Sequence, residues 1–226
     1  MSQETRVAEG LVLRVIPFRE DDRILSLFTQ EAGMIKAIDK GVRRRSHTWM
    51  PLTKVEIVYR ESKGEIFTCC DMTLVDPLPL LRTQLPQLQA GCDMVDALLT
   101  SQMMGKAAPA LYALLCCYLE KIAHAPDPWA LAISFRVKLL RHDGWVALPF
   151  RCGLCGEFLE ETAYLRQAES WCPIHRPTDS TGWDKSVLET LYRLALSQSY
   201  REICETPVSL ALQERVIQWF ALCVTP

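Results

Sequence analysis

The chain has 226 residues, enough for one large domain or two small ones with a real hydrophobic core. Its formal net charge is −2, which excludes nucleic-acid binding through a general excess of basic residues, so any such surface must be local. No apolar run approaches the roughly 20 residues of a membrane span, and the first residues contain no apolar signal segment, so we expect a cytoplasmic protein without a membrane partner.

Short strand-like segments fill the sequence up to about Pro77. They alternate apolar and polar residues or are rich in β-branched residues, and turn signals such as Glu31-Ala32-Gly33 separate them. Five strands are predicted, at residues 10–17, 23–29, 34–38, 54–59 and 65–71. Five short strands in so few residues indicate a small, partly open barrel of the OB-fold type, which commonly binds single-stranded nucleic acid.

Helical periodicity replaces the strand pattern after Pro77. Asp127 and Pro128 are a typical N-cap and first helical residue, and Asp184 can cap a later helix. Helices are predicted at 85–104, 109–123, 128–142, 185–198 and 207–223. The predicted fold class is therefore α+β and multi-domain, with an OB-fold barrel in residues 1–77 and a helical domain in residues 78–226.

A cysteine-rich motif interrupts the helices at about residues 150–178. Cys152 and Cys155 are separated by two residues, sixteen residues follow, and Cys172 and His175 are again separated by two. Two such pairs can each cover one side of a tetrahedral Zn²⁺ ion, and the resulting Cys₃His shell leaves no open position for water or substrate. We therefore predict a zinc knuckle whose metal is structural.

Two other interpretations of these cysteines compete with a zinc site. The chain has ten cysteines, several of them in apolar surroundings, so the four residues could simply be small apolar side chains. A redox CxxC motif is disfavoured because the motif does not follow a strand and open a helix. In the absence of an export signal, the remaining cysteines are expected to be reduced thiols.

A second motif is basic. Residues 36–46 hold five basic side chains against one acidic one, on the connection between the third and fourth predicted strands, where long cationic side chains can reach phosphates. The basic residues are Lys36, Lys40, Arg43, Arg44 and Arg45. A solvated loop is the plainer interpretation, but acidic and basic residues are equal in number over residues 1–77, so the cluster forms a local patch. Trp49, Tyr59 and Phe67 could stack bases, although such residues more often belong to the core of a barrel, and Trp49 was the one most expected to be exposed.

The order of these parts resembles the bacterial recombination mediator family RecO. The resemblance rests on Glu9 to Leu13, Phe18 to Leu25, the Lys40-Gly41-Val42-Arg43-Arg44 element, and Phe135 to Gly144 just before the CxxC pair. It implies an OB-fold that binds single- and double-stranded DNA, with contacts from Lys40, Arg43 and Arg44 and with Lys36 and Arg45 beside them.

The same resemblance implies the partners and the absence of catalysis. Family members anneal complementary strands and act with RecR to load RecA onto DNA coated by single-strand-binding protein (SSB), whose acidic C-terminal tail they bind. In some family members, arginines help to bind this acidic tail, but this chain has Ile133 and Ser134 at those positions. Other cations, such as Arg136, Lys138 or Arg141, would have to bind the tail here. Asp39 stands where the family usually has alanine, next to Lys40.

We therefore expect a non-enzymatic, nucleoid-associated DNA-binding mediator with a structural Zn²⁺. The alternative is a zinc-stabilised interaction scaffold whose barrel binds protein or RNA. A hydrolase or transferase ranks third, because no nucleophile and base occur together in a known motif.

Overall fold

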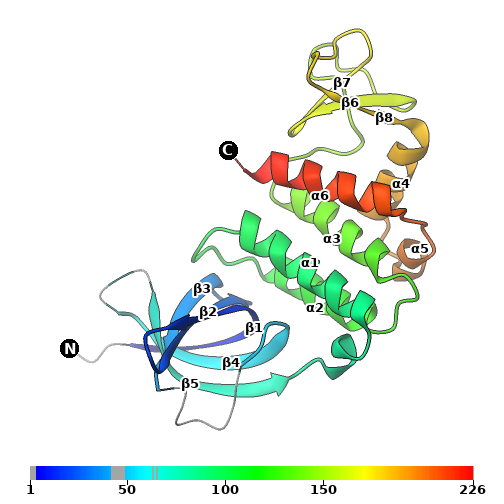
Figure 1. The fold of residues 1–226 in the computed structure, drawn as a ribbon. Helices are drawn as coiled ribbons and strands as arrows, with labels where there is room; N and C mark the ends of the chain where they lie inside the picture. The colour runs from blue at the N-terminus through cyan, green and yellow to red at the C-terminus, as the bar shows by residue number, and fades with distance from the viewer. Residues whose placement is uncertain (1–3, 42–48, 63, 65, 226) are drawn as a thin grey trace. The chain divides into compact units, whose positions relative to one another are not determined.

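The computed structural model describes residues 4–41, 49–62, 64 and 66–225 (Figure 1). Spatial proximity groups the chain into two compact units, Met1–Glu120 and Lys121–Pro226. The two units are defined by contacts within the fold, whereas the boundary expected after residue 77 marks the change from strands to helices. That domain boundary therefore stays a prediction. No helix in the described part of the chain is long and apolar enough to cross a membrane.

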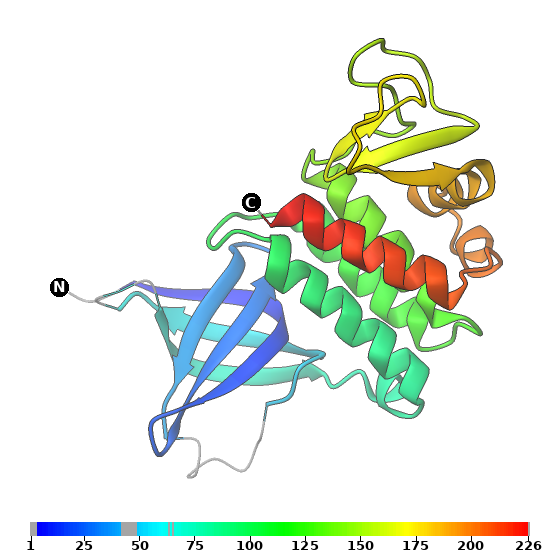
Figure 2. The same ribbon diagram turned by 45° about the horizontal axis from the view of Figure 1, so that its top comes forward.

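The first unit begins with a closed five-stranded barrel (Figures 1 and 2). Its strands are β1 (Thr5–Phe18), β2 (Asp22–Thr29), β3 (Gly33–Asp39), β4 (Thr53–Arg60) and β5 (Phe67–Asp76). The order around the barrel is β1-β2-β3-β5-β4, and only β3 and β5 pair in parallel. Each strand overlaps one of the predicted segments, so the predicted OB-type barrel is confirmed.

A β-bulge in β1 changes which residues of this strand face the core. The register with β2 shifts between Val12 and Arg14. Val12 and Val15 both pack in the barrel core, although strict alternation would place residues three apart on opposite faces. The extra residue therefore reverses the in-and-out pattern of the second half of β1.

Two helices and a short 3₁₀ turn complete the first unit. They are η2 (Pro79–Arg82), α1 (Leu85–Ser101) and α2 (Pro109–Ile122). Leu52, buried and with φ of 59°, lies against Gly91 of α1, where an added Cβ would be 3.2 Å from Leu52 Cδ1. The Arg82 guanidinium donates hydrogen bonds to the carbonyls of Pro51 (2.7 Å) and Leu52 (3.3 Å). These contacts hold the segment before β4 against the helices.

The second unit is built around α3 (Pro128–His142). The residues from Ala130 to Val137 are buried without interruption, and the three helices that follow all pack on α3. These are α4 (Lys185–Leu196), α5 (Tyr200–Cys204) and α6 (Leu210–Val224). As predicted, the Asp127 side chain caps α3 by accepting a hydrogen bond from Trp129 N at 3.0 Å. Only α5 was not predicted among these helices.

A three-stranded sheet precedes α4 and was not predicted either. Its order is β7-β6-β8, with β6 (Thr162–Arg166), β7 (Glu169–Trp171) and β8 (Thr181–Asp184). Asp184 ends β8 and caps α4, because its Oδ1 accepts a hydrogen bond from Val187 N at 3.0 Å. The predicted cap at Asp184 is therefore confirmed, and it couples the sheet directly to a helix.

A close backbone approach fixes the turn between β2 and β3. Gly33 has φ of 65°, and a Cβ built on it would lie 1.9 Å from the carbonyl oxygen of Lys106 in the α1–α2 connection. Beside it, Gly105 N donates a hydrogen bond to Met34 O at 2.8 Å. The barrel and the connection between its two helices therefore touch through backbone atoms at a position that excludes side chains.

We predict that Gly33→Ala destabilises the protein by about 1–3 kcal/mol more than Gly105→Ala, because overpacking adds to the strain of a positive φ. Gly105 is the matched control, since its φ is 71° but nothing lies within 4 Å of an added Cβ. The free energy of unfolding of both variants should be measured by urea denaturation. Equal losses would contradict the close approach of Lys106.

Candidate nucleic-acid face and metal centre

Part of the predicted basic patch lies on β3. Lys36 is within the strand and Lys40 follows its end, and both side chains are exposed. The remaining three predicted DNA-binding residues, Arg43, Arg44 and Arg45, lie outside the described residues. The Gly41 N–H donates a hydrogen bond to Asp22 Oδ1 at 3.2 Å, which fixes the chain after Lys40 beside the turn between β1 and β2.

Asp39 does not share the exposed face of its basic neighbours. It is fully buried and stands opposite Arg23 in the β2–β3 register. Successive strand residues point to opposite faces, so the Asp39 carboxylate points away from the face that carries Lys36 and Ile38. The acidic residue within the basic motif therefore opposes the positive field of the outer face less than the sequence alone indicates.

Arg14 joins Lys36 across the outer face of the barrel. In the strand registers Arg14 is opposite Ser26, and Ser26 is opposite Lys36. The two exposed cations are thus separated by one strand, at about 10 Å between their backbones. Arg14 is not among the five predicted DNA-binding residues, although the sequence marks it, with Arg19 and Arg23, as a residue that could extend the basic surface. Regular alternation from Val12 would turn Arg14 into the core, and the bulge turns it outward.

A row of isoleucines runs beside the cations. Ile16 is opposite Ile24, and Ile24 is opposite Ile38. Ile16 is 44% exposed and the other two are half-buried. The outer face of β1, β2 and β3 therefore combines apolar surface with exposed positive charge, which suits a ligand that has both bases and phosphates.

The aromatic residues considered for base stacking lie mainly in the core. Trp49 and Tyr59 are 8% and 2% exposed and belong to the core of the barrel. Phe67 is half-buried, with its ring 5.0 Å from that of Tyr59 in an edge-on arrangement. Trp49, the best candidate for exposure among the three, is therefore buried, and the plainer interpretation of these rings as core residues holds.

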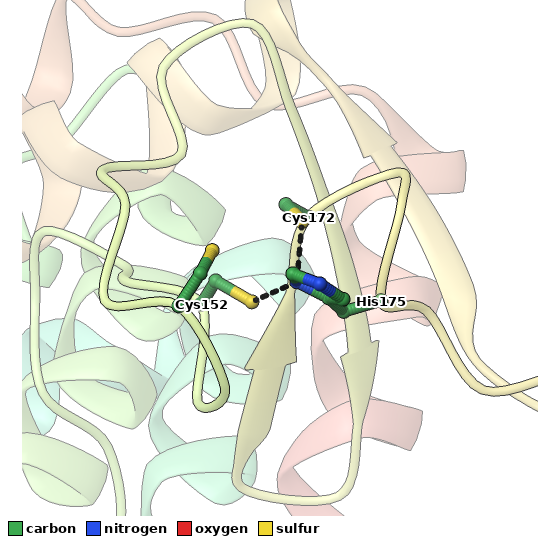
Figure 3. A group of neighbouring side chains, drawn as sticks. Cys152, Cys172 and His175 are labelled. Atoms are coloured by element: carbon green, nitrogen blue, oxygen red, sulfur yellow. Dashed lines mark hydrogen bonds between the residues drawn. The ribbon is translucent and has the colours of Figure 1, made fainter.

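The four predicted metal ligands come together in the second unit. The ligand atoms of Cys152, Cys155, Cys172 and His175 all lie within 4.8 Å of one another. Figure 3 shows Cys152 and Cys172 directed at His175, whose Nδ1 is 3.6 Å and 3.3 Å from their respective sulfur atoms. The two halves of the motif therefore close on one point, although sixteen residues separate them in the chain.

Backbone hydrogen bonds shape the first loop of this cluster. Cys152 N donates to Glu157 O and Gly156 N donates to Cys152 O, both at 2.9 Å. Gly156 has φ of 74°, a conformation that glycine adopts without strain. Gly153 N also donates to Ser170 O of β7 at 2.9 Å, which ties this loop to the strand that leads into Cys172. The ligands are thus positioned by the fold itself.

The electrostatics of the cluster favour a cation. Burial alone would raise the pKa of the Cys152 thiol, but the backbone N–H groups of Cys155, Cys172 and Leu154, with His175, outweigh it and lower the pKa to about 5. The Glu157 N–H lowers the pKa of Cys155, yet burial and the neighbouring sulfur atoms of Cys152 and Cys172 together raise it more. One thiolate is therefore already stabilised, and a metal ion would stabilise the others.

This donor set fits a closed metal site. Three sulfur atoms and one imidazole nitrogen are ligands that Zn²⁺ takes in structural sites, and ligand atoms around one tetrahedral ion lie roughly 3.8 Å apart. The observed separations are close to this value, so the four residues can hold a metal ion. All ten cysteines of the chain are free of disulfide bonds in this structure.

The cations of α3 that were considered for an acidic tail have contacts inside the second unit. Lys138 Nζ donates a hydrogen bond to Ser197 O at 2.6 Å, and Arg141 Nη1 donates to Ala195 O at 2.8 Å. The Arg136 guanidinium is buried, 4.9 Å from the centre of the Phe220 ring. These side chains therefore satisfy the C-terminal carbonyls of α4 and pack against α6.

Comparison with known proteins identifies the family. Residues 1–78 match the family model described as "Recombination protein O N terminal", and residues 87–221 match "Recombination protein O C terminal". The chain is 22% identical to the DNA repair protein RecO of Chlamydia muridarum (strain MoPn / Nigg), over 97% of this chain and 96% of that protein. It is 26% identical to the DNA repair protein RecO of Cupriavidus pinatubonensis (strain JMP 134 / LMG 1197), over 97% of this chain and 75% of that protein. The two family models together match most of the chain, which therefore belongs to the RecO family of DNA repair proteins.

Proposed function

We propose that this protein is a non-enzymatic recombination mediator. It binds single- and double-stranded DNA, anneals complementary strands, and helps to load RecA onto SSB-coated DNA together with a RecR-like partner in the cytoplasm, on the nucleoid. The observation that carries the proposal is the outer face of β1, β2 and β3, where exposed cations flank a row of isoleucines in a chain of this family.

Electrostatics supports annealing without catalysis. Two DNA strands repel each other through their phosphates, and a cationic surface that neutralises part of this charge raises the rate at which they meet. Arg14, Lys36 and Lys40 supply such charge in the described part of the barrel. The predicted contacts of Arg43, Arg44 and Arg45 would extend it along the same connection.

We propose that the metal ion is Zn²⁺ and that its role is structural. A full shell of four protein ligands leaves no position for a substrate, and the ion would lock two loops that are otherwise joined by few hydrogen bonds. The ligand loops carry exposed apolar residues at their tips, with Leu154 69% and Ile174 84% exposed. These exposed apolar tips favour the second candidate function, in which the zinc-stabilised unit is a protein-interaction scaffold. The two candidates are compatible, because a mediator that docks on partner proteins would use the same tips.

We predict that replacing Arg14 and Lys36 together by alanine weakens binding to all DNA sequences alike. On duplex DNA, log affinity falls as log salt rises, and each phosphate contact adds about 0.9 to the steepness of that fall. The double variant should therefore have a slope that is shallower by about two. Fluorescence anisotropy at several salt concentrations measures this. The control is Arg193→Ala with Arg201→Ala, which removes the same charge from exposed positions on α4 and α5. A wild-type slope in the Arg14/Lys36 variant would reject this face as the DNA site.

We also predict one equivalent of zinc per chain, measured by elemental analysis of the purified protein. Cys155→Ser should remove the metal and lower the melting temperature, because the free energy of metal binding is part of the folding free energy. Cys117→Ser is the matched control, since Cys117 is also an exposed, free cysteine but lies outside the cluster. A wild type without metal and with unchanged stability in Cys155→Ser would contradict a structural zinc.

A further inference from the structure

The second unit contains a cavity that neither the metal cluster nor the proposed DNA face uses. Its volume is about 760 Å³, within the range of small-molecule sites. It lies between the β6–β7–β8 sheet and α6, which Figure 2 shows side by side. Three tryptophans line it, Trp145, Trp183 and Trp219, together with side chains that can form hydrogen bonds.

Two of the tryptophans form a preformed wall. The rings of Trp183 and Trp219 are 5.5 Å apart in an edge-on arrangement, and the Arg215 guanidinium lies 4.2 Å from the centre of the Trp183 ring. Trp219 Nε1 donates a hydrogen bond to Gln167 O at 2.8 Å, which fixes the β6–β7 turn over the cavity. This wall therefore needs little ordering when a ligand binds.

The third tryptophan is accessible. Trp145 follows α3, and its backbone N–H donates a hydrogen bond to Leu140 O at 2.9 Å, so its position is set by the end of the helix. Its side chain remains 46% exposed, which is unusual for so large an apolar ring. A flat ligand entering the cavity would find an open aromatic face at this position.

The polar groups of the cavity can both donate and accept. The amides of Gln167 and Gln218 and the hydroxyls of Thr181 and Thr225 line it. Such a mixture suits the edge of a planar heterocycle, which carries carbonyl and amino groups next to each other.

The charges that line the cavity balance one another. Arg166 forms ion pairs with Glu169 (3.0 Å) and Asp179 (3.7 Å), so two carboxylates stand beside it. Arg215 is stacked on Trp183 and donates a hydrogen bond to Gly182 O. The two carboxylates offset the two guanidinium groups of the lining, so the cavity suits a neutral aromatic ring, and a phosphate joined to that ring would stay outside in solvent.

We infer that this cavity holds one unstacked base of single-stranded nucleic acid. The inference rests on the proposed DNA-binding function and adds a second contact, made by aromatic stacking. Every base offers a π-face, so stacking tolerates any sequence, but a base inside a duplex is not available. The cavity would therefore contribute to binding of single strands and not of duplexes.

Fluorine NMR tests occupancy of the cavity directly. The full chain is labelled with 5-fluorotryptophan, each resonance is assigned by a single Trp→Phe variant, and an oligothymidylate of about ten nucleotides is added. The resonances of Trp145, Trp183 and Trp219 should shift, while that of Trp129, which does not line the cavity, stays in place. The inference is overturned if the three cavity resonances do not move at saturating oligonucleotide. It is also overturned if the wild type binds no oligonucleotide at all.

A variant series separates this site from the barrel face. Trp145→Ala should weaken single-strand binding roughly 5- to 150-fold, the effect of losing one stacking ring, and leave duplex affinity and the salt slope unchanged. Trp145→Phe keeps an aromatic face and should retain most of the affinity. Equal single-strand affinity in Trp145→Ala and wild type would overturn the cavity site and leave the barrel proposal intact. The cavity site would also be overturned if only the Arg14/Lys36 variant lost affinity, for single-stranded and for duplex DNA alike.

Discussion

The bulge in β1 is the constraint on which the outer face of the barrel depends. Because one extra residue is inserted between Val12 and Arg14, Val15 returns to the core and Arg14 turns to solvent. Without the bulge, an arginine would enter a barrel core lined by apolar side chains, where an unpaired charge is very costly. The same backbone feature thus preserves the core and places a cation in line with Lys36. A change that removed the bulge would therefore affect both the stability of the barrel and the position of the Arg14 charge.

In the second unit, the Cys₃His cluster is the feature that fixes the irregular segment before the sheet. Strands of three to five residues bury little apolar surface, and β7 is only three residues long. The knuckle loops are held by a few backbone hydrogen bonds, and four side chains that converge within 4.8 Å would allow one ion to link the two loops. The sheet in turn supports Asp184, the cap of α4, so a metal site would stabilise helices that it does not touch.

The sequence was a good guide where a local rule decides the outcome. Strand alternation predicted all five barrel strands, the Asp127-Pro128 pair predicted the start of α3, and the cysteine spacing predicted the four side chains that converge on one point. Non-local contacts decided the rest. The role of Arg14 depends on pairing with β2, the burial of Trp49 depends on the closed barrel, and Lys138 and Arg141 are used by carbonyls more than fifty residues away. The strands β6 to β8 are too short for alternation to be recognised.

A protein with the proposed mediator function must hold single strands firmly and still let complementary strands pair, and these demands favour two kinds of contact. Phosphate contacts act on single and double strands alike and weaken as salt rises, so they bring strands together without distinguishing them. Base stacking is nearly independent of salt and is lost as soon as the base enters a duplex. A barrel face of cations combined with an aromatic cavity in the second unit would therefore release DNA in the state that annealing produces. Pairing itself would remove the base from the cavity, so no nucleotide hydrolysis is needed to free the product.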